Sequence, residues 1–356
     1  MSALPPHLAD PARRPATAPP TTAPVAGCPL TDAFGRQLRY LRLSVTDRCD
    51  LRCVYCMAAR PVFMPRDQIL TIEELARLAG IFMANGVRRI RLTGGEPLVR
   101  RGVMTLIERL GAAVGDGRLD ELTLTTNGTR LATHAADLAA AGIRRVNVSL
   151  DSLDPDTFHR LTRGGRLNGV LDGLDRAQAA GLHVKINAVA LAGVIEREVD
   201  GLIRFAHGRG MDLTLIEVMP LGETGHDRRT QFLSLDSLCN DLATRWTLTS
   251  LPDRTAGPAR YLRVAETGGR LGLITPLSHR FCEHCDRVRV SVAGRLYTCL
   301  GHDGAVDLAP ALRAGAPDAT EALIRQTLRL KPQGHDFAIT RDAAHGIDRT
   351  MAALGG

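Results

Sequence analysis

The chain has 356 residues, of which 44% are hydrophobic, and it carries a formal net charge of +7. This length allows one large domain or two with an ample core, and no run of 18 or more apolar residues is present, which excludes a transmembrane helix. No basic run has interleaved aromatic residues. Nucleic-acid binding is therefore supported by net charge alone, and a polyanionic small substrate is the sharper alternative.

The N-terminal segment, residues 1–31, is rich in Pro, Ala and Thr and lacks the apolar run of a signal peptide. It predicts a disordered leader on a cytoplasmic protein. The chain has eight cysteines, and in this setting they are typical of metal ligands rather than of disulfides. Six form two triads. Of the other two, Cys28 and Cys239, the latter lies in an amphipathic pattern and is expected to fill apolar space.

From residue 39 onward, strand-like and helix-like segments alternate. The predicted strands cover residues 41–45, 89–92, 121–125, 145–150, 183–191 and 212–218, and the predicted helices cover 72–85, 103–113, 132–141, 167–180 and 197–209. Six β/α units in series predict an α/β fold with a parallel sheet, either a partial barrel or an open sheet. After residue 222 the rhythm breaks. We expect a barrel of residues 32–222 and a smaller C-terminal subdomain, residues 223–356, laid against its opening, with helices at 235–246 and 321–330.

The first triad, Cys49, Cys53 and Cys56, has C-x3-C-x2-C spacing on a loop after the first predicted strand. Three soft thiolates suit an iron–sulfur cluster and leave one metal without a protein ligand. Such an open position can bind a substrate. The alternative is a structural zinc site, although the loop lacks the usual fourth ligand.

This spacing, with Tyr55 before the last cysteine, resembles the radical S-adenosylmethionine (SAM) superfamily. The resemblance implies an incomplete (βα)6 barrel and a [4Fe–4S] cluster held by the three cysteines. It also implies that SAM binds the open iron and is cleaved to methionine and a 5′-deoxyadenosyl radical.

Other candidate residues follow later strands, where parallel α/β proteins carry their sites. The run Gly94-Gly95-Glu96-Pro97 permits close backbone approach and would alone predict a tight turn; beside the cysteine loop it resembles the superfamily's site for the SAM amino group. Ser149 and Asp151 follow the fourth strand, where Asp151 either binds a ribose or caps a helix. Met219, after the sixth strand, lies either over an adenine or in the core.

The second triad is Cys282, Cys285 and Cys299. Because His302 follows Cys299 by three residues, a Cys3His zinc site is one interpretation and an iron–sulfur cluster is the other.

Arg287 and Arg289 come directly after Cys285 and alternate along an extended segment, so they share one face. Two guanidinium groups beside a metal site suit the binding of phosphates, whereas a solvated arginine pair is the ordinary surface alternative.

Several runs together resemble one family within the superfamily, the GTP 3′,8-cyclases of molybdenum cofactor biosynthesis. The match extends from about Phe34 to the last residue. It is carried by residues 41–49, 90–97, 125–128 and 147–151, by Phe281 with the second triad and Arg287-Val288-Arg289, and by the terminal Gly355-Gly356.

The resemblance assigns roles to individual residues. The second triad would hold a second [4Fe–4S] cluster whose open iron meets the guanine base. The catalytic set would be the first triad, Arg287, Arg289, Gly355 and Gly356; the SAM contacts would be Tyr55, Gly95, Ser149 and Met219. The GTP contacts would be Arg42, Arg91, Thr125, Lys185, Arg287, Val288 and Arg289.

The implied activity is that of a lyase converting GTP to (8S)-3′,8-cyclo-7,8-dihydroguanosine 5′-triphosphate, the first step toward molybdopterin. The product would pass to cyclic pyranopterin monophosphate synthase, and an external donor would supply electrons. No nucleic acid or membrane partner is expected, and the oligomeric state is open, a homodimer included. Two rivals remain: another two-cluster radical SAM enzyme of the maturase type, and a zinc protein that binds nucleic acid.

Overall fold

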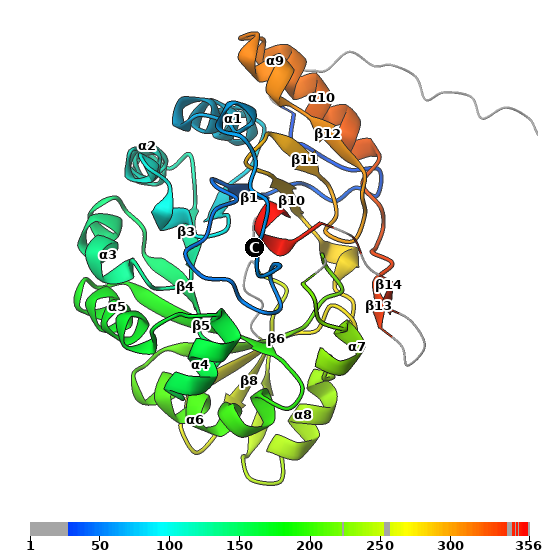
Figure 1. Cartoon of the computed structure of the whole chain (residues 1–356). Helices are drawn as coiled ribbons and strands as arrows, with labels where there is room; N and C mark the ends of the chain where they lie inside the picture. The colour runs from blue at the N-terminus through cyan, green and yellow to red at the C-terminus, as the bar shows by residue number, and fades with distance from the viewer. Residues whose placement is uncertain are drawn as a thin grey trace, which may run out of the picture.

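The computed structural model describes residues 28–222, 224–252, 257–339, 344–345, 347 and 349–354. Six parallel strands follow one another in the sheet and curve around a central space, with helices on the outside (Figure 1). The strands are β1 (Tyr40–Ser44), β2 (Arg89–Thr93), β3 (Glu121–Thr126), β4 (Arg145–Ser149), β5 (His183–Ala190) and β6 (Asp212–Glu217). The helices between them are α1 (Ile72–Ala84), α2 (Val103–Gly115), α3 (Leu131–Ala140), α4 (Pro155–Thr162), α5 (Leu167–Ala179) and α6 (Ile195–Gly208). The parallel α/β sheet predicted from the β/α rhythm is confirmed, and so is the incomplete barrel that the resemblance implies.

Local sequence explains where helices begin. Helix α1 starts after Thr71, whose hydroxyl accepts from the Glu74 amide while the Glu74 carboxylate accepts from the Thr71 amide, a capping box. Helix α4 was not predicted. It is capped by Asp154, which accepts from the amide of Thr157 at 2.8 Å, so the helix-cap role considered for Asp151 belongs to Asp154.

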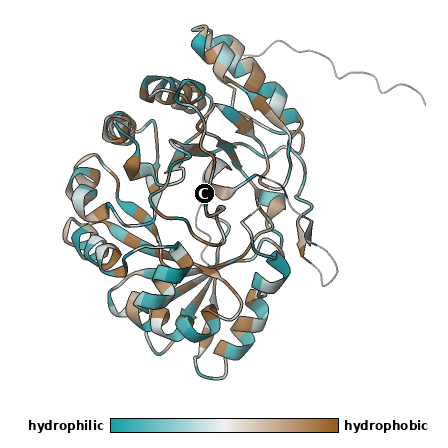
Figure 2. Ribbon diagram, in the orientation of Figure 1, coloured by the Kyte–Doolittle hydropathy of each residue, from teal (hydrophilic) through white to brown (hydrophobic). Residues whose placement is uncertain are grey.

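Strand alternation separates the core from the interior of the barrel. Leu41 and Leu43 of β1 are fully buried in the main hydrophobic cluster with the helices, so Arg42 between them faces the opposite side. The helices carry both hydrophilic and hydrophobic residues (Figure 2), as amphipathic covering helices do. The other barrel strands alternate in the same way, and the positions that face the barrel interior are therefore mostly polar.

The C-terminal third extends the same sheet at both edges. The sheet order is β12-β11-β10-β1-β2-β3-β4-β5-β6-β9-β8-β7, with β10 parallel to β1 and β9 parallel to β6. The sheet therefore continues past the expected division at residue 222, and the C-terminal residues add strands beside β1 and β6. The added strands are β7 (Leu248–Leu251), β8 (Arg260–Val264), β9 (Arg270–Ile274), β10 (Arg287–Val290), β11 (Arg295–Tyr297) and β12 (Ala305–Asp307).

The remaining elements lie around this sheet. They are α7 (Arg228–Gln231), α8 (Leu235–Leu242), α9 (Ala309–Arg313), α10 (Pro317–Arg329), the pair β13 (Ala338–Ile339) and β14 (Ala344–His345), and α11 (Met351–Leu354). None of the helices in the described ranges has the length and apolar character needed to cross a bilayer.

The boundary expected for the leader is four residues too late. Leu30 is only 1% exposed, and its backbone bonds to Asn85 and Leu38. Residues 28–31 thus belong to the folded body. The rest of the predicted leader, residues 1–27, lies outside the described residues.

Candidate active site

The cysteine loop follows the carboxyl end of β1 and is fixed by backbone contacts. The amides of Arg52 and Val54 donate to the carbonyls of Thr162 and Leu161 at the end of α4, at 3.0 and 2.9 Å. The Cys56 amide donates to the Cys53 carbonyl at 2.9 Å. Helix α4 therefore serves as the platform on which the first triad is mounted.

Arg163, directly after α4, holds the loop from a second direction. It is the one non-glycine residue of the described chain with positive φ, +52°. Its guanidinium donates to the carbonyls of Arg52 and Met57 at 3.2 and 2.9 Å. Sequence reasoning missed this residue because nothing in its local pattern distinguishes it from a surface arginine.

Two glycines let the neighbouring strand end touch the cysteine loop. A Cβ at Gly95 would lie 2.3 Å from the carbonyl oxygen of Arg48, and one at Gly94 would lie 2.5 Å from that of Thr46. The Gly95 amide donates to the Thr46 carbonyl at 2.8 Å. The glycine pair is thus required by backbone contact with the segment that carries Cys49.

We expect Gly95→Ala to displace this segment and to remove the first cluster while sparing the second. Overpacking of this kind costs about 1–3 kcal/mol in the free energy of unfolding. Iron analysis after anaerobic reconstitution should fall by about half. Gly169→Ala is the matched control, because nothing lies within 4 Å of a Cβ there. Full iron content in Gly95→Ala would contradict the packing argument.

Two buried carboxylates brace the loops at this end of the barrel. Glu96 accepts from the Thr126 hydroxyl and the amides of Leu98 and Asn127, at 2.9, 3.0 and 2.6 Å, and burial raises its pKa to about 7. Glu96 is thus bonded to three groups of the chain itself. Glu96 therefore orders the loop after β2 and joins it to the end of β3.

Asp151 bonds to the aromatic residue of the cysteine loop. Its carboxylate accepts from the Tyr55 hydroxyl at 2.7 Å and from the Val189 amide at 2.8 Å, and burial raises its pKa to about 6. Ser149, the last residue of β4, is half-buried on the interior side. The candidate SAM residues Tyr55, Gly95 and Ser149 therefore all lie at the carboxyl ends of the strands.

The second triad lies beside the edge formed by β10 and β11. Cys285 precedes β10 by two residues and Cys299 follows β11 by two, and the two thiols are close enough for their charges to interact. The Cys285 amide donates to the Cys282 carbonyl at 3.0 Å. Because β10 runs parallel to β1 with Arg287 beside Tyr40, Cys285 lies at the amino end of these two strands, whereas the first triad follows the carboxyl end of β1.

Five basic residues point into the barrel from four strands, and we call them the interior basic cluster. Arg42 of β1 lies in register with Arg91 of β2 and Arg289 of β10. Burial, Arg289 and Arg91 hold the pKa of Arg42 well below its ordinary value, and burial and Arg287 lower that of Arg289 to about 10. The members are Arg42, Arg91, Lys185, Arg287 and Arg289.

No carboxylate of the described chain forms an ion pair with this cluster, whereas the amino end of the barrel is neutralised. The charges at that end are compensated by the pairs Arg89–Asp286 at 2.7 Å, Arg145–Glu121 at 2.6 Å and Arg270–Asp212 at 2.9 Å. Buried Nε atoms of Arg42, Arg287 and Arg289 and the Thr125 hydroxyl have no protein partner. Unpaired buried donors facing one space indicate a site for a polyanion.

Tyr40 and Tyr261 support the cluster, and sequence reasoning missed both. The guanidinium carbons of Arg91 and Arg287 lie 5.6 and 5.9 Å from the centre of the Tyr40 ring, and the Lys185 ammonium donates to the Tyr261 hydroxyl at 2.5 Å. Tyr40 shares a face with Arg42 two residues later, so strand alternation contains a signal for it.

The side chain of Val288 faces the hydrophobic core, unlike those of Arg287 and Arg289. Its side chain is 1% exposed and packs in the main hydrophobic cluster. Because alternate residues of β10 face opposite sides, Val288 points away from Arg287 and Arg289. A contact between Val288 and GTP would therefore be made by its backbone, and the GTP contact expected at this residue stays a prediction.

Each triad offers the donors of an iron–sulfur cluster. The donors of each triad are three free thiols, and an iron–sulfur cluster takes cysteine thiolates.

His302 is engaged elsewhere. Its Nε2 donates to the carbonyl of Gly334 at 2.9 Å and lies 3.7 Å from a carboxylate oxygen of Asp336. This bond occupies Nε2, so a metal bound by His302 would be ligated through Nδ1.

The C-terminal segment enters the site. The backbone of Ala352 in α11 lies close enough to the Cys56 thiol to influence its pKa, and α11, in red, lies near the centre of the curved sheet in Figure 1. Met351 and Met219 are both partly buried against a small hydrophobic cluster that includes Tyr297. Gly355 and Gly356 lie outside the described residues.

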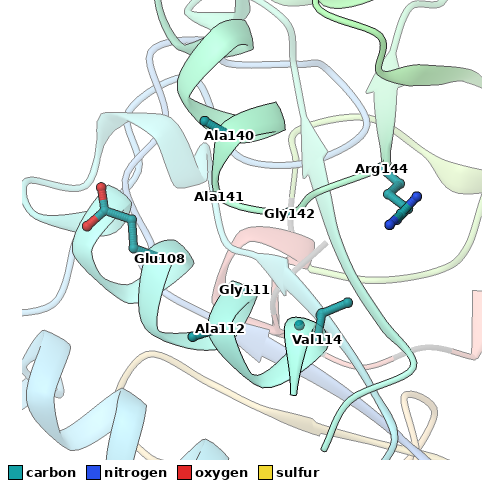
Figure 3. A pocket seen from close by; sticks show the side chains of 9 residues that line it. Glu108, Gly111, Ala112, Val114, Ala140, Ala141, Gly142 and Arg144 are labelled. Carbon is teal, nitrogen blue, oxygen red and sulfur yellow. The ribbon is translucent and has the colours of Figure 1, made fainter. Parts of the chain in front are cut away.

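A separate hollow of about 580 Å³ lies between the ends of α2 and α3, near Glu108 and Arg144 (Figure 3). Arg144 directly precedes β4, so this hollow lies at the amino ends of the strands, opposite the cysteine loop. Small residues such as Gly111 and Ala141 form much of its wall. It takes no part in the site.

The curved parallel sheet and the cysteine loop at its carboxyl end define a radical SAM enzyme. The model of the radical SAM superfamily matches residues 43–206, and that of molybdenum cofactor synthesis C matches residues 211–337. In fold, the chain is similar to the Streptococcus suis protein SuiB bound to S-adenosylmethionine. That likeness has a TM-score of 0.60 and 16% identity, over 87% of this chain and 73% of the other.

Curated relatives narrow the class to one family. The chain is 57% identical to a GTP 3′,8-cyclase of Rhodopseudomonas palustris strain TIE-1, over 96% of this chain and 99% of that protein. It is 56% identical to one of Caulobacter vibrioides, over 99% of each. The chain belongs to the GTP 3′,8-cyclase family, whose cofactors are SAM and two [4Fe–4S] clusters.

Proposed function

We propose that this protein converts GTP to (8S)-3′,8-cyclo-7,8-dihydroguanosine 5′-triphosphate, the first step of molybdopterin biosynthesis. One observation carries the proposal beyond family membership: the interior basic cluster is buried, unpaired by carboxylates, and placed between two cysteine triads. A triphosphate carries about four negative charges near neutral pH and matches such a set of cations.

The first triad would hold the cluster that binds SAM, and the second would hold the cluster that meets the guanine base. When bound, the first cluster and SAM supply the radical that removes hydrogen from C3′ of the ribose, after which C3′ bonds to C8 of guanine. The chain's own residues would fix the two ends of the nucleotide. The interior basic cluster would bind the triphosphate, and the second triad, which lies beyond Arg287, would hold the cluster that meets the base. Fixing both ends makes the ring closure an intramolecular reaction within a water-poor interior.

We expect Arg289→Ala to weaken GTP binding by about 1.5–3 kcal/mol, roughly 10- to 150-fold in Kd, because a buried charge-assisted contact is lost. Arg287→Ala should act similarly. Arg289→Lys should recover only part of the affinity, since lysine lacks the bidentate fork. Arg295→Ala, an exposed arginine of the adjacent strand, is the matched control. Calorimetric titration of GTP measures the effect, and an unchanged Kd in both alanine variants would assign Arg287 and Arg289 to mere surface charge.

A maturase-type radical SAM enzyme is the nearer rival. Peptide substrates have no need of five uncompensated cations, so the interior basic cluster argues against it. Anaerobic incubation with GTP, SAM and dithionite, followed by mass analysis of the nucleotide, tests the proposal. Unchanged GTP beside cleaved SAM would refute it.

The cellular setting follows from the same chemistry. All eight cysteines are free thiols, as in a reducing compartment, and we place the protein in the cytoplasm. An external donor would supply electrons, and the unstable product would pass to cyclic pyranopterin monophosphate synthase.

A further inference from the structure

Lysine is almost absent from this chain. Of its 45 Lys and Arg residues only two are lysines, Lys185 and Lys331. Both are buried, at 6% and 4% exposure. Lys185 belongs to the interior basic cluster, whereas Lys331 lies outside it. All the remaining Lys and Arg positions are arginines. The two buried sites therefore use a property that arginine lacks, a compact ammonium group with three donors.

The Lys331 ammonium lies against the second triad. Nζ donates to the carbonyl of Thr298 at 2.6 Å, to that of Arg287 at 3.0 Å and to the sulfur of Cys285 at 3.6 Å. Three donors thus meet three acceptors. Thr298 is the neighbour of Cys299, so this one side chain joins both strands that carry the triad.

Lys331 has no carboxylate partner within ion-pair distance in the part of the chain that the structure describes. The groups whose charge interacts with it are Cys285 and Cys299. A buried ammonium without a counter-charge is costly. The cost is offset when the thiols beside it carry negative charge as ligands of a metal centre.

The rest of the segment Lys331–Gly334 packs around the remaining ligand. A Cβ at Gly334 would lie 3.6–3.7 Å from the Cys282 side chain. The Arg36 guanidinium donates to the carbonyls of Pro332, Gln333 and Cys282, at 2.7, 3.0 and 2.7 Å. The segment is therefore held in place independently of the ammonium, which makes Lys331 open to substitution without loss of the surrounding fold.

We propose that Lys331 is a positioning residue for the second cluster, whose buried positive charge offsets the negative charge of the ligating thiolates and raises the reduction potential of the cluster. Three thiolates on an oxidised [4Fe–4S] core with charge +2 leave a net charge of −1, and reduction makes it −2. A nearby cation stabilises the reduced form more than the oxidised form. The inference rests on the proposed function only for the presence of the second cluster.

The test measures iron content and the midpoint potential of the second cluster in Lys331→Met and Lys331→Gln. The full chain carries alanine in place of Cys49, Cys53 and Cys56, so that the remaining cluster is observed alone by electron paramagnetic resonance. Both variants should shift the potential to more negative values, because both lose the charge although glutamine keeps donors. Arg295→Met removes an exposed positive charge from β11 and should leave the potential unchanged, because water and salt screen a surface charge.

Each outcome decides the question without any turnover of GTP. Loss of the cluster from both variants, in chains that keep the wild-type circular dichroism spectrum and melting temperature, also supports the inference. An unchanged potential in Lys331→Met, or a shift in Lys331→Met that Lys331→Gln reverses, would overturn a role for charge. Unfolding of both variants would overturn it too and assign Lys331 to the fold alone.

Discussion

Replacing Cys282, Cys285 and Cys299 together by alanine is expected to abolish conversion of GTP while SAM is still cleaved. The first triad and its supports, α4 and Arg163, do not depend on these residues. In the proposed mechanism the second cluster positions the base, and positioning of this kind is worth about 10⁵-fold or more in effective concentration. Product should therefore fall below detection.

The measurement pairs iron analysis with product analysis under anaerobic conditions. Iron should fall from about eight per chain to about four, since each [4Fe–4S] cluster holds four. 5′-Deoxyadenosine and methionine should still form with dithionite. Cys239→Ala is the control for loss of a thiol outside both triads, and it should retain all iron and product. Tightly bound zinc in the wild-type triad, or cyclised nucleotide from the triple variant, would sink the assignment.

Deleting Gly355 and Gly356 is expected to leave both clusters intact and to stop the cyclisation of GTP. A frayed end is the ordinary fate of two terminal residues. The segment before them is held in place, because the Ala352 backbone lies near the Cys56 thiol and the Arg349 guanidinium carbon lies 4.2 Å from the centre of the Tyr297 ring. Glycine is the residue best able to continue into a narrow space.

A tag appended to the C-terminus should act like the deletion, whereas the same tag before residue 1 should be harmless. Iron content and low-level SAM cleavage should match the wild type in all variants, and only the cyclised nucleotide should disappear from the two altered at the C-terminus. If the truncated enzyme forms product at the wild-type rate, the two glycines have no role in the reaction.

Sequence reasoning located the β/α units because each strand and most of the helices have a recognisable pattern of apolar residues. The six parallel strands fall within a residue or two of the predicted ranges. It missed α4, which is short and begins at a proline, and it assigned no partners to the later strands. The pairing of β10 with β1 has no local signal, because it joins segments from opposite ends of the chain.

The same division applies to the site. The triads and the alternation of Arg287 and Arg289 are visible as spacing. What spacing does not show is whether a charge is compensated, so the contrast between the neutralised amino end and the unpaired interior emerges only in three dimensions. Lys331 and Arg163 were missed because each contacts a cysteine-bearing segment that is distant in sequence.

The flanking of the barrel by its own last third has a consequence for biosynthesis. The strand that carries Arg42 leaves the ribosome long before its neighbour β10 exists, and β6 waits likewise for β9. Until then the nascent sheet has two open edges, which are prone to pair with other chains. Pairing so distant in sequence is also slow to form. Two of the five residues of the interior basic cluster arrive with β10. No partly synthesised chain therefore holds the complete cluster, and oxygen-sensitive cofactors are best installed after the last strand has docked.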